Sequence, residues 1–375
     1  MSKNLFSRRN FIKKSALTGI GATTVAGYSF GRSRNLILKE TNEAIEFSYP
    51  SSATKRLIKL LNIKYPIVQA PTAGVVTTAL VSEVTKSGAL GGLPLTWTTP
   101  KDSRRRIKDV QKITNGSFYA NFVLNFEPKA LDSAIKSGIK IIQFSWGIPS
   151  KQIVQKIKRA NIILGIQVTS EDSAISAIHA GADYLVCQGT EAGGHVHASR
   201  PLHEALEEVL AVAGNIPVVA SGGIATGKDI YTYLSLGAAG VVMGSRFVAT
   251  EESSAHPKYK QALINSSAKD TVFTVCLNKG WSNATHRIIR NKTFKMWEAA
   301  GCPVEGNRPN ENEVLVTYKD SDATVTRYEG NVPNTDMMGK VEEIGMYAGK
   351  GVGHINDIPT VAELINSIWN EFLNK

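Results

Sequence analysis

The stretch IPVVASGGIATGKDIYTYLSLGAAGVVMGSRF, residues 216–247, contains one complete unit of alternating secondary structure. The runs IPVVASGGI and AGVVMGSRF are short, apolar and rich in β-branched residues, as is typical of strands buried on both faces. The amphipathic stretch GKDIYTYLSLGA between them predicts a helix. Two buried strands joined by a helix indicate parallel pairing, because the helix returns the chain to the start of the next strand. The sequence therefore predicts a parallel sheet covered by helices.

The same unit recurs along most of the chain. Amphipathic stretches separate the apolar runs, and several of these stretches end in Gly, a common helix terminator. No G-x-G-x-x-G follows the first run, as an open dinucleotide-binding sheet would require. We therefore predict a (β/α)8 TIM barrel over residues 54–249. Its eight strands are expected in the runs that begin at Tyr65, Gly88, Phe118, Ile139, Asn161, Asp183, Ile216 and Ala239.

The rest of the chain is expected to form smaller parts around this barrel. A polar linker is predicted over residues 34–53, and the strand rhythm breaks from residue 250 to residue 345. We expect the broken region to be a lid or small second domain. Residues 346–375 contain a glycine-rich loop and an amphipathic helix from Thr360, which we expect to pack on the barrel.

The composition is that of a soluble globular protein, with 42% hydrophobic and 20% charged residues. The net charge is +11, but residues 1–34 hold seven bases and no acid, so the remainder carries only +4. No basic run is interleaved with aromatic residues, and we expect no nucleic-acid partner. The cysteines Cys187, Cys276 and Cys302 form no C-x-x-C pair, and no His/Cys cluster has ligand spacing, so we expect no metal site.

The excess charge lies in a segment that resembles a bacterial twin-arginine export signal. SRRNFIKKSAL, residues 7–17, precedes a small, weakly apolar run that ends at Phe30. We therefore expect residues 1–33 to engage the twin-arginine export machinery. The protein would then be periplasmic, or membrane-anchored and facing the periplasm. If the segment is only an ordinary basic terminus, the protein stays in the cytoplasm. Because the twin-arginine route carries folded proteins, export suggests a cofactor that is loaded first.

The stretch QGTEAGGHVH, residues 188–197, holds the strongest candidate for chemistry. It directly follows the sixth apolar run, so it is expected at the carboxyl end of a strand, on the active face of a barrel. Gly193 and Gly194 allow the backbone to approach a planar ligand or to take a positive φ. His195 would then face that ligand. Imidazole suits proton transfer near neutral pH, and we predict His195 as the catalytic base.

The loops after the seventh and eighth runs indicate a phosphate-bearing ligand. SGGIATGK, residues 221–228, and MGSRF, residues 243–247, place glycines and a helix start at the same end of the barrel. Backbone N–H groups at helix amino ends bind phosphate, and these two loops are its usual place in such barrels. The alternative is that the glycines only form tight turns.

Together these motifs resemble the nitronate monooxygenases, formerly called 2-nitropropane dioxygenases, which are FMN enzymes on a (β/α)8 barrel. The resemblance runs from about Tyr65 to the carboxyl terminus. Its most specific motif is QGTEAGGH. Four further stretches contribute: YPIVQAP, FSWGIP, ASGGIATGKD and VVMGSRFVATEESSAHPKYK.

The resemblance implies a set of cofactor-binding residues and one catalytic residue. The first loop would pass under the flavin, two amides would bond its rings, and a glycine pair would let the sixth loop approach it. His195 corresponds to the family's active-site base. Thr72 and His197 depart from the family's usual Met and Gly, which bears on the substrate. The implied FMN ligands are Gln69, Ala70, Thr72, Asn121, Gln188, Gly193, Gly194, and, at the phosphate, Gly222, Gly223, Met243, Gly244 and Ser245.

The resemblance thus implies FMN-dependent oxidation of small anionic nitronates, such as propionate-3-nitronate, by O2 to a carbonyl compound and nitrite. Two alternatives remain. One is a flavin-dependent, NAD(P)H-linked reductase of the enoyl-thioester type, whose family has a similar E-x-G-G-H loop. The other is an exported flavin-binding protein without turnover. For nitronate oxidation, Trp146, Trp281 and His286 are candidates to line the pocket.

Overall fold

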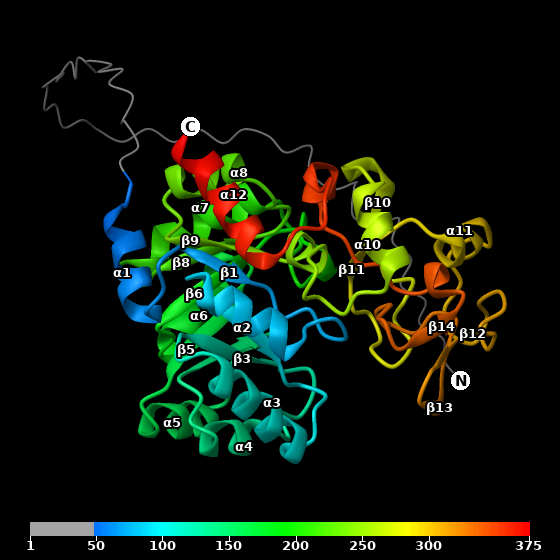
Figure 1. The fold of residues 1–375 in the computed structure, drawn as a ribbon, viewed down its shortest axis with the longest axis horizontal. Coiled ribbons are helices and arrows are strands. Elements are labelled where there is room, and N and C mark those ends of the chain that lie inside the picture. The colour runs from blue at the N-terminus through cyan, green and yellow to red at the C-terminus, as the bar shows by residue number, and fades with distance from the viewer. Residues whose placement is uncertain (1–48) are drawn as a thin grey trace, which may run out of the picture. The chain divides into compact units, whose positions relative to one another are not determined.

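The computed structural model describes residues 49–375 (Figure 1). The predicted export signal, residues 1–33, and most of the predicted linker lie outside the described residues. Eight parallel strands form a sheet in the order β1-β9-β8-β6-β5-β4-β3-β2, and a bridge between Val68 and Leu90 joins its two edges. The predicted barrel is therefore confirmed. Its strands are β1 (Ile67–Gln69), β2 (Gly91–Pro94), β3 (Phe118–Val123), β4 (Ile141–Ser145), β5 (Ile163–Val168), β6 (Tyr184–Gln188), β8 (Val218–Ser221) and β9 (Gly240–Met243).

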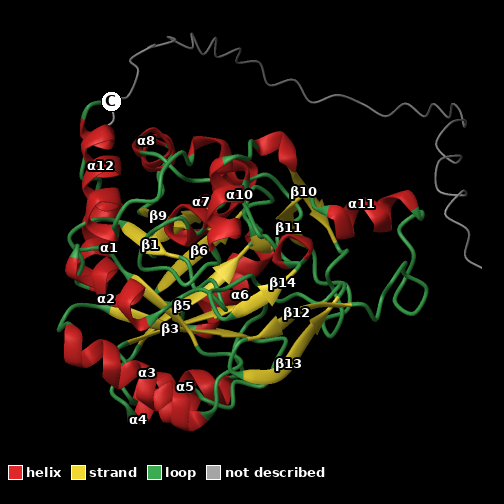
Figure 2. Ribbon diagram, turned by 45° about the vertical axis from the view of Figure 1, so that its right-hand side comes forward, coloured by secondary structure: helices red, strands yellow, loops and turns green. Residues whose placement is uncertain are grey.

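Helices cover the outside of the barrel (Figure 2). Most begin at a Ser or Thr whose hydroxyl accepts a backbone N–H of the first turn, as at Thr99, Ser150 and Thr226. The helix directly after β9 is the short α9 (Ser245–Val248), and α12 (Val361–Leu373) packs against α8 and α2. The other covering helices are α2 (Thr78–Lys86), α3 (Pro100–Ile113), α4 (Leu131–Lys136), α5 (Lys151–Arg159), α6 (Glu171–Ala180), α7 (Leu202–Ala213) and α8 (Gly227–Ser235).

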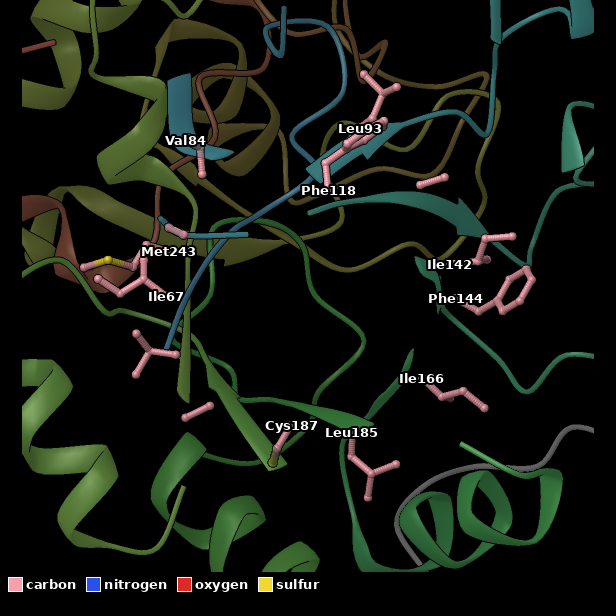
Figure 3. Packing of buried hydrophobic residues seen from close by; sticks show 14 of the residues in the cluster. Ile67, Val84, Leu93, Phe118, Ile142, Phe144, Ile166, Leu185, Cys187 and Met243 are labelled. Atoms are coloured by element: carbon pink, nitrogen blue, oxygen red, sulfur yellow. The ribbon is translucent and has the colours of Figure 1, made fainter. Parts of the chain in front are cut away.

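Alternate residues of each strand build two layers of core. One set points outward to the helices and includes the strand residues labelled in Figure 3, among them Phe144, Cys187 and Met243. The other set fills the barrel interior, with Tyr119 and Tyr184 fully buried. Helix α1 (Ser52–Leu61) contributes Leu57 and Leu61 to that inner layer. The amino end of the barrel is therefore closed, which leaves the carboxyl end for a site.

The segment between β9 and α12 forms a lid that belongs to the same compact unit as the barrel. Two small antiparallel sheets organise it: β13-β12-β14, and β10-β11-β7. Strand β7 (Gly194–His195) comes from the loop after β6, so a barrel loop completes a lid sheet. The lid elements are α10 (Pro257–Ile264), η1 (Ala268–Asp270), β10 (Thr271–Thr274), β11 (His286–Ile289), α11 (Lys292–Ala299), β12 (Val314–Tyr318), β13 (Ser321–Thr326), β14 (Met337–Gly339), η2 (Val341–Glu343) and η3 (Lys350–His354).

A buried ion cluster holds the lid sheet β13-β12-β14 against α11. Arg327 has 1% of its side chain exposed, and its guanidinium lies 2.6 Å from a carboxylate oxygen of Glu313 and 2.7 Å from one of Glu343. It also donates to the Thr293 hydroxyl at 2.6 Å. Within residues 49–375, none of the helices combines the length and apolar character that crossing a membrane requires.

Candidate active site

A cavity of about 590 Å³ lies at the carboxyl end of the barrel, under the lid. This volume is within the range of cofactor and small-ligand sites, roughly 300–1,000 Å³. Its lining comes from the ends of the barrel strands, from the lid, and from the glycine-rich segment before α12. The lining residues fall mainly within the stretches 70–75, 94–97, 121–126, 143–146, 186–195, 221–225, 242–248, 277–281, 330–334 and 347–352, in which only some positions face the cavity.

Four carboxamides form the floor of this cavity on neighbouring strands. Asn121 and Gln188 were predicted, whereas Gln143 and Gln167 were not; all four line the cavity. The amide of Asn121 donates to the Ser145 hydroxyl at 2.9 Å. Gln167 donates to the side-chain oxygen of Gln188 at 2.7 Å. These bonds fix the orientation of the amides, which leaves a row of donors and acceptors suited to a polar heterocycle.

The loop that carries His195 is held rigidly between barrel and lid. In β7, Gly194 pairs with Arg287 and His195 with His286 of β11. The Arg287 side chain also donates to the Thr190 carbonyl oxygen at 2.7 Å. The carboxylate of Glu191 accepts the backbone N–H of Leu202 at 2.9 Å, which braces the loop. The position of His195 therefore depends on both parts of the molecule.

The imidazole of His195 lies in an aromatic surrounding on the cavity wall. The Trp281 ring stacks on it at a centroid distance of 4.4 Å, and the Tyr347 ring lies 5.5 Å away. Burial and the neighbouring His286 lower the pKa of His195 to about 3. Neither of its ring nitrogens bonds another group among the described residues. At neutral pH the side chain is thus a neutral imidazole whose nitrogens remain available to a ligand.

The structure shows which of the other residues expected to line the pocket do so. Trp146 and Trp281 line the cavity, as predicted, whereas His286 does not and that prediction is wrong. His286 is fully buried behind β7, where its Nδ1 faces the Ala284 carbonyl oxygen at 2.8 Å. The Leu277 N–H donates to its Nε2 at 3.1 Å, which satisfies both ring nitrogens. Burial lowers the pKa of His286 to about 4.

His197, which departs from the family's usual Gly, is exposed and lies outside the cavity lining. Its ring stacks on Trp146 at a centroid distance of 4.9 Å and an interplanar angle of 18°. The backbone N–H of His197 donates to the side-chain oxygen of Gln188 at 2.9 Å. Its side chain therefore supports the outer face of a cavity residue, and it does not compete with His195. Thr72, the other departure, does line the cavity.

The two glycines of the loop are required for different reasons. Gly194 has φ +77° and open space around the position of a Cβ, so backbone conformation alone favours glycine there. At Gly193 a Cβ would lie 2.4 Å from the backbone nitrogen of Gly349. From the sequence, either a close approach to a planar ligand or a positive φ was expected at these glycines. The structure assigns Gly193 to close contact with the segment before α12.

The loops after β8 and β9 offer unpaired donors at one end of the cavity. Among the described residues, the backbone N–H groups of Gly222, Gly223 and Gly244 donate to no other group. The Ser245 hydroxyl accepts the N–H of Gly349 at 3.0 Å, which draws the segment before α12 to the same place. Free backbone donors and a hydroxyl at a cavity end suit a phosphate group. The residues present therefore fit the phosphate of a mononucleotide.

The amino end of α8 is not part of that donor set, contrary to the sequence argument. Asp229 accepts the N–H groups of Ala225 and Thr226. Glu371 of α12 accepts the N–H of Gly227 at 2.8 Å. Two carboxylates thus satisfy the start of this helix internally.

Two predicted cofactor residues direct their side chains away from the cavity. The amide oxygen of Gln69 accepts the N–H of Gly92 at 2.8 Å, where it links the two strands at which the barrel closes. Met243 packs in the outer core, as Figure 3 shows. Neither lines the cavity, so only their backbones remain near it. The other predicted residues line the cavity: Ala70, Thr72, Asn121, Gln188, Gly193, Gly194, His195, Gly222, Gly223, Gly244 and Ser245.

Comparison with known proteins gives consistent results at the levels of sequence and structure. The family model for nitronate monooxygenase matches residues 54–136 and 126–371. A probable nitronate monooxygenase of Staphylococcus haemolyticus is 34% identical over 292 residues, which cover 65% of this chain and 81% of the relative.

Two solved structures are similar to the chain. FabK from Thermotoga maritima is 26% identical, with a TM-score of 0.68 over 85% of this chain and 96% of that one. The nitroalkane oxidase from Streptomyces ansochromogenes is 23% identical, with a TM-score of 0.69 over 85% of this chain and 98% of that one, a likeness of fold.

Proposed function

The chain belongs to the nitronate monooxygenase family, and from this premise we propose that it oxidises nitronates with O2 to carbonyl compounds and nitrite, using FMN. The observation that carries the proposal is the neutral imidazole of His195 above a carboxamide floor, in a cavity whose far end presents free backbone donors. When bound, FMN would supply the redox chemistry: it takes electrons from the substrate and passes them to O2.

The residues that would hold FMN divide by chemistry. The N–H groups of Gly222, Gly223 and Gly244 would bind the phosphate together with the Ser245 hydroxyl. Asn121 and Gln188 would bond the polar edge of the ring system, and the unpredicted Gln143 and Gln167 extend the same row. The lid covers this region, which favours a site from which water is excluded.

The low pKa of His195 favours nitronates over neutral nitroalkanes. A neutral nitroalkane must first lose a proton from its α-carbon, and a base whose conjugate acid has a pKa of about 3 drives that step weakly. A nitronate already lacks this proton. For such a substrate, His195 needs only to donate a hydrogen bond to a nitronate oxygen and hold the anion in place.

The test is turnover by purified protein loaded with FMN. We expect propyl-1-nitronate and propionate-3-nitronate to drive oxygen consumption with formation of nitrite, and neutral nitroethane to react far more slowly. His195→Asn should lower kcat/KM for propyl-1-nitronate, and this variant should retain bound FMN. A yellow protein that consumes no oxygen with either nitronate would refute the activity.

The enoyl-thioester reductase alternative, raised by the E-x-G-G-H loop at residues 191–195, is tested in the same preparation. Oxidation of NADH that depends on a crotonyl thioester, without nitronate turnover, would establish that alternative. Retained FMN without turnover in any of these assays would favour the binding protein.

We also propose that residues 1–33 direct export by the twin-arginine route. The support is the sequence pattern of Arg8 and Arg9 followed by a weakly apolar run. Fractionation of a bacterial host should recover the full chain outside the cytoplasm. Changing both arginines to lysine should retain it in the cytoplasm, and equal distribution of the two forms would contradict the proposal.

A further inference from the structure

The wall of the cavity beside His195 is a continuous group of aromatic rings. It consists of Trp97, Phe126 and Trp146, which follow β2, β3 and β4, and of Trp281 from the lid; we call these four residues the aromatic wall. All four line the cavity. The Trp281 ring lies 4.8 Å from Trp146 and 5.0 Å from Phe126, and the Phe126 ring lies 5.2 Å from Trp97.

The aromatic wall runs from the reactive position to solvent. At its inner end Trp281 stacks on His195. At its outer end Trp97 leaves 55% of its surface exposed, the largest such fraction for an aromatic residue among the exposed apolar side chains of the described chain. An exposed Trp in the lining of a cavity offers apolar surface that only a ligand would cover. Trp146 has a left-handed φ of +61°. This backbone conformation is unfavourable for a residue other than glycine, and such strain is found mainly at functional sites.

The charged side chains that line the cavity also bear on the kind of substrate it accepts. Among the described residues that line it, Lys279 is the single charged side chain. Its Nζ donates to the Thr326 hydroxyl at 2.8 Å and lies 3.7 Å from a carboxylate oxygen of Glu329. Thr326 in turn donates to Glu329 at 2.7 Å. The cation is therefore already paired within the lid, and the described residues that line the cavity offer no free cation for a second anionic group of a substrate.

These two observations select between kinds of nitronate. We propose that the preferred substrate is a nitronate, or the nitro compound that gives rise to it, that carries an uncharged aromatic ring. The ring would stack on the aromatic wall while the nitronate lies at His195. A carboxylate in place of the ring, as in propionate-3-nitronate, would meet apolar rings and lose its hydration without a partner. The inference rests on the proposed function.

The experiment compares three nitronates on the FMN-loaded protein: those of 2-phenyl-1-nitroethane and 1-nitropropane, and propionate-3-nitronate. We expect kcat/KM to be highest for the phenyl compound, by about tenfold over the propyl compound, since aromatic contacts contribute about 2- to 10-fold each. Propionate-3-nitronate should be the poorest of the three. Equal or lower kcat/KM for the phenyl compound than for the propyl compound would overturn the proposal.

A matched pair of variants locates the effect. Trp97→Ala should lower the ratio of kcat/KM for the phenyl compound to that for the propyl compound by about tenfold, and Trp97→Phe should retain most of it. The control is Trp297→Ala, because Trp297 lies in the lid on Phe294 and outside the cavity lining. It should leave the ratio unchanged. An unchanged ratio in Trp97→Ala would contradict the proposal.

A binding measurement separates this inference from the proposed function. If none of the nitronates is oxidised, the proposed activity fails, and calorimetric titration of the FMN-loaded protein with 2-phenyl-1-nitroethane and 1-nitropropane still tests the aromatic wall. Tighter binding of the phenyl compound, lost in Trp97→Ala, would support recognition of the ring. Equal binding of the two compounds would overturn it.

Discussion

At the scale of single residues, Gly193 and Gly194 show how neighbouring glycines can be constrained by different forces. We predict that Gly193→Ala is the more damaging change, because its Cβ would meet the backbone of Ala348 and Gly349 at 2.5 Å or less. It should cost at least about 3 kcal/mol of unfolding free energy and reduce retention of FMN. Gly194→Ala, the control, should cost only about 1–2 kcal/mol for its positive φ. Urea denaturation of both variants would measure this, and equal losses would contradict the assignment.

The buried His286 makes stability depend on pH. Its pKa falls from 6.5 to about 4 on folding, so the unfolded chain binds more protons between these values. The contribution of neutral His286 to the free energy of unfolding is therefore complete above pH 6.5 and is lost as the pH falls toward 4. Between pH 7 and pH 4.5 the loss should be about 2 kcal/mol, and His286→Gln should remove this part of the pH dependence. His203→Gln, at a side chain 66% exposed, is the control and should leave the pH dependence unaltered.

Individual site residues were predictable where their position along a strand decided their role. His195 and Gln188 could be assigned because they follow or end an apolar run, and the carboxyl end of such a strand is the active face. Asn121 lies inside β3 and was named through the family resemblance. Gln69 and Met243 could not be resolved in this way. Their strands are buried on both faces, so the sequence shows no alternation that distinguishes an inward from an outward side chain.

At the scale of elements, the lid depends on a buried charge cluster. We predict that Arg327→Met costs about 3–5 kcal/mol of unfolding free energy, because it leaves the buried carboxylate of Glu343 paired only with Lys292, whose side chain is 63% exposed, at 3.3 Å. The double variant Arg327→Met with Glu343→Leu should recover much of the loss. The exposed pair Arg105–Asp102 provides the control, and Arg105→Met should cost less than about 1 kcal/mol. A loss in Arg327→Met no larger than in the control would show that the cluster contributes little.

The eight barrel strands were predictable because each is a short apolar run between helical stretches. Strand β7 was not, since two residues show no periodicity and their pairing depends on β11, far along the chain. The helix from Thr360 was expected to pack on the barrel, but its neighbours, α8 and α2, could not be predicted. A glycine-rich stretch before it was visible in the sequence, but its contacts with Gly193 and Ser245 arise only in the fold.

At the scale of the whole molecule, the base-bearing loop and the lid should open together. The Val196 N–H donates to the Thr285 carbonyl oxygen at 2.8 Å, next to the pairing of β7 with β11. We predict that Ile288→Ala, in the buried core of the lid, increases hydrogen exchange in residues 194–196 as much as in β10. Strand β6 is the internal control and should keep its protection. Faster exchange confined to β10 and β11 would show that the two parts open separately.

The closed amino end of the barrel also determines how molecules enter and leave the cavity. Because Leu57, Leu61 and the inner tyrosines seal that end, the cavity is reached from the lid side. There would therefore be one entrance for substrate, oxygen, nitrite and carbonyl product, at the rim of the cavity beside Trp97. Slow release of product would then delay binding of the next substrate molecule. The width of this entrance would limit turnover independently of the chemical step.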